Sequence, residues 1–200
     1  MAHVIVDGVR LPQLVADHPA LELCNTVAGW NEDEPFDYLV GYEELVRLVG
    51  HLGLLDRPAV DDLVARGAAA PAAAAQVLRR TRDLRAATYA IVAGTPTDDD
   101  WTLVGRAARA AALAGSLGPG QTSLATWRHD PGEGGLTTPL HLLAWQVHEL
   151  LTATPAVTVG CCPGRDCGWV FVNRGNRRWC VMATCGNREK ARRHAARRPR

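Results

Sequence analysis

Two pairs of cysteines near the carboxyl end constrain this chain more than any other feature. Cys162 and Cys167 are separated by four residues, and Cys180 and Cys185 are separated by four residues as well. This spacing lets one turn of the chain present two thiolates to a single ion, and two such turns supply the four ligands of a tetrahedral Zn²⁺. We therefore predict one structural zinc ion bound by these four cysteines.

The remaining two cysteines receive other interpretations. Cys161 is adjacent to Cys162 and is the alternative ligand, but only Cys162 repeats the four-residue gap of the second pair. Cys24 lies among apolar residues and is predicted to be a core thiol. Four cysteine ligands close the zinc shell and leave no open position for water, and the chain contains no nucleophile elbow, His-Glu-x-x-His or phosphate loop. We therefore expect a protein that is not an enzyme.

The residues around the cysteines predict a small zinc domain over residues 156–200. Residues 167–172 alternate in hydrophobicity like a strand, residues 177–179 form a second candidate strand, and the composition is helical from Gly186 to about Arg198. The order of knuckle, hairpin, knuckle and helix is similar to a treble-clef zinc finger. About forty residues are too few for a metal-free core, so we expect zinc binding to supply the folding energy of this domain.

The charge of the chain is divided between its two parts. Residues 161–200 contain ten Arg and one Lys against two acidic residues, whereas residues 1–160 contain 11 basic and 19 acidic residues. A tail of net charge +9 on a body of net charge −8 favours binding of a polyanion, most simply duplex DNA. The candidate nucleic-acid-binding residues are Arg174, Arg177, Arg178, Asn187, Arg188, Lys190, Arg192, Arg193 and Arg197.

Three alternatives to DNA binding remain open at this level. Trp169, Phe171 and Trp179 can stack on unpaired bases of RNA, or they can form the small core of the zinc domain. The basic arm can instead dock an acidic protein partner or the acidic body of a second copy, which would give a homodimer. Arg177 or Arg178 can balance the charge of the zinc thiolates in place of contacting nucleic acid.

Residues 1–155 predict a mostly helical domain with one or two short hairpins. A hairpin is expected from residues 4–6 and 9–11 around the Asp7-Gly8 turn. The apolar spacing predicts helices over 14–28 and from Tyr42 to about Gly50, another near Asp61, and further helices from Pro71, from Trp101 to Leu113 and from near Pro139. Residues 115–120 read as a loop and residues 123–128 as a strand. The fold class is therefore mainly α with small β-hairpins.

Asn25, Thr26 and Trp30 are polar or aromatic residues at the end of an apolar helix. One interpretation is a ligand pocket for a small-molecule effector on the amino-terminal domain, and the other is a helix C-cap. No nucleotide, metal or substrate motif distinguishes these two interpretations.

The quoted residues also resemble a known family. Cys162 to Arg188 resembles the CGNR zinc finger of bacteria, named for Cys185-Gly-Asn-Arg188, and the resemblance extends through Cys-Gly-Trp-Val-Phe, Arg-Arg-Trp-Cys and Met-Ala-Thr-Cys-Gly-Asn-Arg-Glu-Lys. The body is similar to the ABATE domain at Leu21-Glu-Leu-Cys-Asn-Thr26 and in its acidic loop followed by the helix from Tyr42 to Leu48. Glu22 and Cys24 depart from that pattern. The resemblance implies a stress-induced transcription regulator and implies that the four cysteines are zinc ligands.

Targeting signals are not evident. Residues 1–7 lack a basic region followed by a long apolar run, and no stretch of about 18 apolar residues occurs. We therefore expect a cytoplasmic protein that does not associate with a membrane.

Overall fold

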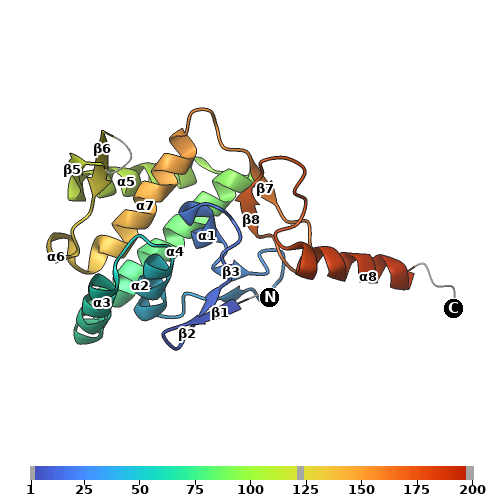
Figure 1. The fold of residues 1–200 in the computed structure, drawn as a ribbon, viewed down its shortest axis with the longest axis horizontal. Coiled ribbons are helices and arrows are strands. Elements are labelled where there is room, and N and C mark those ends of the chain that lie inside the picture. The colour runs from blue at the N-terminus through green and yellow to red at the C-terminus, as the bar shows by residue number, and fades with distance from the viewer. Residues whose placement is uncertain (1–2, 121–123, 197–200) are drawn as a thin grey trace.

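The fold is a bundle of helices with a small zinc-finger domain at one end (Figure 1). It is described from a computed structural model, which places residues 3–120 and 124–196. The helices are α1 (Pro19–Cys24), α2 (Tyr42–His51), α3 (Arg57–Ala69), α4 (Pro71–Ala93), α5 (Asp98–Ala114), α6 (Pro131–Gly134), α7 (Thr138–Thr152) and α8 (Asn187–Ala196). Of these described helices, none is both long enough and apolar enough to cross a membrane.

Short antiparallel hairpins accompany the helices. The strands are β1 (His3–Val6), β2 (Val9–Pro12), β3 (Val27–Ala28), β4 (Phe36–Asp37), β5 (Ser116–Pro119), β6 (Ala125–Arg128), β7 (Val159–Cys161) and β8 (Val170–Val172). They pair as β1–β2, β3–β4, β5–β6 and β7–β8. The predicted fold class, mainly α with small hairpins and a zinc finger, is confirmed.

The long helix α4 lies at the centre of the helical domain and contacts α1, α2, α3, α5 and α7. Its buried side carries Val77, Leu78, Leu84 and Ala87, as the apolar spacing predicted. Pro71 occupies its first turn, and Gly94 ends it in the left-handed conformation at φ +82°. Because α4 runs through the whole domain, it connects the distant helices with the zinc finger.

The predicted helix over residues 14–28 is much shorter in the structure. Asp17 adopts a left-handed conformation at φ +61°, so the chain cannot be helical there. His18 then accepts a hydrogen bond from the backbone N–H of Ala20 and Pro19 begins α1, which ends after Cys24. Cys24 is fully buried, as expected for a core thiol.

Two further boundaries differ from the prediction. The helix expected near Asp61 begins at Arg57, because Asp56 accepts a hydrogen bond from Ala59 N–H and caps it. Residues 116–119, predicted to be loop, form strand β5 and pair with β6, where Leu117 lies opposite Trp127. Ser123, the predicted first residue of that second strand, lies outside the described residues. Residues 116–119 form a strand because they pair with β6, although the Gly and Pro residues among them disfavour strands.

The zinc finger begins with a hairpin whose strands flank the first cysteine pair. Strand β7 pairs with β8 in the register Val159–Val172 and Cys161–Val170. The sequence had predicted that residues 177–179 would pair with residues 167–172, but residues 177–179 are not a strand. A single π-type turn, Met182–Gly186, then leads directly into α8, which projects from the rest of the molecule (Figure 1).

Candidate metal centre and basic helix

The four predicted ligands converge on one point. The Sγ atoms of Cys162, Cys167, Cys180 and Cys185 all lie within 4.8 Å of one another, and all four side chains are buried. This donor set of four close, buried sulfurs is the set that a tetrahedral structural Zn²⁺ requires. The site fits one structural zinc ion, as the spacing predicted.

Each cysteine pair is shaped by a backbone turn. Cys167 N–H donates to the Gly164 carbonyl at 3.0 Å, and Cys185 N–H donates to the Val181 carbonyl at 2.9 Å. Gly164 packs against the sulfurs, because a Cβ atom at this position would lie 3.5 Å from Cys185 Sγ. Each turn therefore brings the two thiols of its own pair close together.

The four thiols of the metal centre differ in the direction of their pKa shifts. Hydrogen bonds from Cys167 and Cys180 hold the pKa of Cys162 below its usual range. Hydrogen bonds with Cys162 lower the pKa of Cys185 and raise the pKa of Cys167 and Cys180. Zinc binding therefore releases protons from the more weakly acidic thiols, so metal affinity falls as the pH falls.

Cys161 does not belong to the metal centre. It lies at the end of β7, exposed, and its thiol donates to the Gly168 carbonyl at 3.6 Å. Because side chains alternate along a strand, Cys161 points away from the side on which Cys162 meets the other sulfurs. The choice of Cys162 over Cys161 is thus the one the geometry supports.

Two arginines of the basic helix are held beside the zinc centre. Arg188 donates to Cys185 Sγ at 3.4 Å, and this hydrogen bond raises the pKa of Arg188. Arg188 and Arg192 both face Asp166, at 4.0 Å and 2.5 Å. These contacts tie the first turns of α8 to the first knuckle, so metal binding also sets the direction of the helix.

The other predicted nucleic-acid-binding residues separate into two groups. Arg174, Arg178, Asn187, Lys190 and Arg193 are exposed, and Arg197 lies outside the described residues. Arg177 is instead occupied by the protein itself: it donates to the backbone carbonyls of Val15 and Cys180 and lies 4.2 Å from the Phe171 ring centroid.

The finger is joined to the helical domain along the outer edge of β8. Asn25 donates to the Val170 carbonyl and accepts from the Val170 N–H, both at 2.9 Å. The Ala16 carbonyl accepts from Val172 N–H at 2.9 Å on the same edge. The helical domain therefore completes the hydrogen bonding of an edge that would otherwise be unpaired.

Aromatic side chains bury this junction. Trp169 is 2% exposed and its Nε1 donates to the Val27 carbonyl at 2.8 Å. Trp30 stacks on Tyr89 with ring centroids 3.9 Å apart, and Tyr89 Oη donates to the Gly168 carbonyl at 2.9 Å. Gly168 has φ +72°, and a Cβ atom there would lie 2.8 Å from Trp30 Cβ. The finger and the helical domain thus share one continuous core.

The residues considered for a ligand pocket hold this junction instead. Asn25 is the C-cap of α1, which agrees with the helix-cap interpretation. Thr26 donates to the Leu23 carbonyl and accepts from Arg85, and Trp30 Nε1 donates to the Cys24 carbonyl. Sequence reasoning missed the junction, because no local pattern shows that a buried Asn pairs with a strand 145 residues away.

These features define the chain as a Cys₄ zinc-finger protein whose finger is built onto a helical domain. Residues 159–198 match the model of the CGNR zinc finger. Residues 17–156 match the ABATE model, which is described as "Putative stress-induced transcription regulator". Because this second match spans more than half of the chain, the protein belongs to the ABATE family, and the resemblance seen in the sequence is confirmed. A search of curated proteins gives no match to the chain.

Proposed function

We propose that this protein is a DNA-binding transcription regulator in which the zinc centre positions a basic helix for contact with duplex DNA. The proposal rests on the exposure of α8 and its closeness to the metal centre. This helix begins two residues after the ligand Cys185 and has no buried residue. It extends away from the helical domain (Figure 1). An α-helix with its side chains has about the width of the major groove, so a free basic helix suits that groove.

The cations of this surface take two roles in the proposal. Arg188 and Arg192 position the helix through Cys185 and Asp166. Lys190 and Arg193 on the helix are exposed, and so are Arg174 and Arg178 near the turn of the finger. We assign these four side chains as the phosphate contacts that position the duplex. The i,i+4 pair of Arg193 with Glu189 is at the surface, where such a pair is worth little and is readily replaced by a phosphate.

The deciding experiment is a binding selection of the zinc-loaded full chain on random duplex DNA. We expect enrichment of a short motif, and four to six phosphate contacts predict a slope of log K against log salt of about −4 to −5. The double variant Lys190→Glu and Arg193→Glu, which changes two of the proposed phosphate contacts on α8, should reduce the magnitude of that slope by about 2. The matched control is Arg79→Glu with Arg109→Glu, which reverses two exposed charges on the helical domain. A selection without enrichment would remove the DNA-binding proposal.

A binding comparison of duplex DNA with single-stranded RNA at fixed salt separates DNA binding from RNA binding. Trp169 and Phe171 are 2% and 1% exposed, so two of the three aromatic rings that base stacking on RNA would use belong to the core, whereas Trp179 is half-buried. Tighter binding of single-stranded RNA than of duplex DNA would identify RNA as the ligand. Enrichment of paired half-sites would support a dimer, since two-fold proteins read two-fold sites. A role in binding rather than catalysis is proposed because the zinc shell is closed by four sulfurs.

A further inference from the structure

A cleft outside the zinc finger lies between α4, α5 and α7. Its volume is about 470 Å³, which lies within the usual range of small-molecule sites. Its apolar floor is formed by Leu84 and Leu140, which are 1% and 3% exposed, and by the half-buried Leu103. The cleft therefore offers a hydrophobic surface of the size of a small organic molecule.

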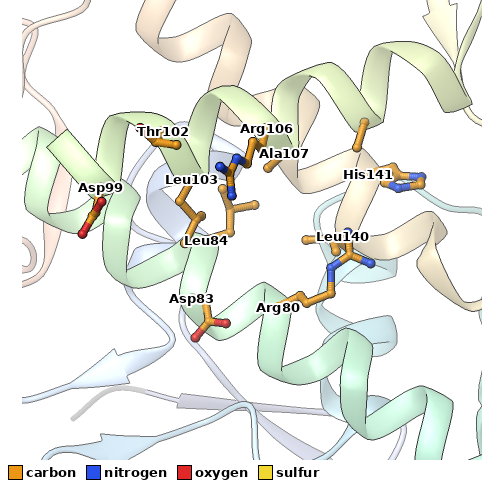
Figure 2. A pocket seen from close by; sticks show the side chains of 11 residues that line it. Arg80, Asp83, Leu84, Asp99, Thr102, Leu103, Arg106, Ala107, Leu140 and His141 are labelled. Carbon is orange, nitrogen blue, oxygen red and sulfur yellow. The ribbon is translucent and has the colours of Figure 1, made fainter.

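Cationic side chains from two helices stand over this floor. Arg80 comes from α4 and Arg106 from α5, and Figure 2 shows both guanidinium groups directed over the cleft between the helices. Neither side chain makes an ion pair or a hydrogen bond with any residue in the described part of the chain. Elsewhere in the helical domain, Arg47, Arg66 and Arg85 are all paired with carboxylates. The two cleft arginines thus keep their donors free although Asp83 and Asp99 line the same cleft.

His141 adds an unsatisfied polar group on the same side of the cleft as Arg80 (Figure 2). Its Nδ1 atom is buried and has no hydrogen-bond partner among the described residues. Burial lowers the pKa of His141, and the nearby His129 and Arg80 lower it further, so the ring is neutral at neutral pH. A buried polar atom without a partner costs stability, so His141 is a polar side chain of the cleft lining that the described residues leave unsatisfied.

We propose that this cleft binds a small organic monocarboxylate. The carboxylate lies between the guanidinium groups of Arg80 and Arg106, with His141 at its side, because guanidinium groups match carboxylate geometry and form its strongest hydrogen bonds. The apolar body of the ligand lies on Leu84, Leu103 and Leu140. Asp83 and Asp99 disfavour a second negative charge on that body, which selects monocarboxylates over dicarboxylates.

The test uses two probes and their uncharged counterparts on the zinc-loaded full chain. 3-Phenylpropanoate and hexanoate, with 3-phenylpropanamide and hexanamide, are titrated while backbone amide resonances are followed by NMR. We expect the carboxylates to shift resonances of α4, α5 and α7 around the cleft. The amides should bind about tenfold more weakly, because each of them lacks the charge that strengthens hydrogen bonds to arginine.

Matched variants assign the binding to the two arginines. Arg80→Gln and Arg106→Gln should each weaken carboxylate binding about tenfold, whereas Arg79→Gln and Arg109→Gln, one residue and three residues away on the same helices, should leave it unchanged. All four arginines are exposed, so these variants keep the fold. The proposal is overturned if neither carboxylate shifts the cleft resonances, if acid and amide bind equally, or if the control variants weaken binding as much. None of these results depends on nucleic-acid binding.

Discussion

Replacing Asn25 by Ala tests whether the helical domain holds the zinc finger in its fold. Asn25 and Val170 are both fully buried, and the Asn25 amide supplies one donor and one acceptor to the Val170 backbone. Cys162 N–H donates to the Trp169 carbonyl across the finger hairpin, so the polar groups of Val170 face the opposite edge and depend on Asn25. The substitution therefore leaves two buried backbone groups without partners.

The expected loss of stability follows from those two groups. Each buried donor or acceptor left unsatisfied costs about 1–3 kcal/mol, which gives about 2–6 kcal/mol for Asn25→Ala. With a urea dependence of about 2 kcal/mol per molar, the unfolding midpoint should fall by about 1–3 M. Since a typical domain is stable by only about 5–15 kcal/mol, this loss is a large fraction of the total.

The assay is urea unfolding at a fixed, saturating concentration of free zinc, followed by tryptophan fluorescence. Asn176→Ala is the matched control, because Asn176 is exposed in the turn of the finger, and it should change stability by less than about 0.5 kcal/mol. Zinc release to a colorimetric chelator gives a second reading, and Asn25→Ala should accelerate it. If Asn25→Ala and Asn176→Ala unfold at the same urea concentration, the junction does not hold the finger and the reasoning fails.

Three further predictions concern the metal and one buried acid. Cys162→Ser should abolish stoichiometric zinc binding while Cys161→Ser preserves it, as measured by metal analysis of the purified variants; equal zinc content in both would contradict the ligand assignment. Strong chelation should remove amide exchange protection from the finger and also from residues 15–17 and 25–30, the segments that contain its hydrogen-bond partners in the helical domain, while α3 keeps its protection. Burial raises the pKa of Glu22 to about 7. The stability that the protonated Glu22 side chain contributes is therefore fully present below the pKa of Glu22 in the unfolded chain, and it is lost as the pH rises through 7. Between pH 5 and pH 8 the wild type should therefore lose about 2.5 kcal/mol more than Glu22→Gln in urea unfolding, and equal losses would refute the shift.

The metal centre could be predicted from the sequence because its ligands are encoded locally. The repeated spacing of the two cysteine pairs selects Cys162 over Cys161, and each pair is closed by a turn of its own residues. The long helices were predicted for the same reason, since the apolar period of α4 is a local signal. Neither prediction needed knowledge of distant contacts.

The features that the sequence did not predict depend on distant contacts. The first strand of the finger, β7, precedes the first knuckle, and its partner β8 follows it, so the pairing depends on the closed knuckle rather than on strand patterns. The later start of α1 follows from the left-handed Asp17, a conformation that Asp adopts only occasionally and that the apolar spacing does not indicate. The cleft of Arg80 and Arg106 joins residues of separate helices that look like ordinary solvated charges in the sequence.

The shared edge of β8 has a consequence for how such proteins arise. Val170 and Val172 of the finger form hydrogen bonds with Asn25 and Ala16 of the helical domain. The residues that complete the finger are therefore encoded in a different region of the gene. Moved alone onto a different protein, the finger would expose Trp169 and leave an open strand edge, which invites aggregation. Recombination that separates the two coding regions would therefore yield poorly folded products, so this finger and its helical domain are expected to be inherited as a single unit.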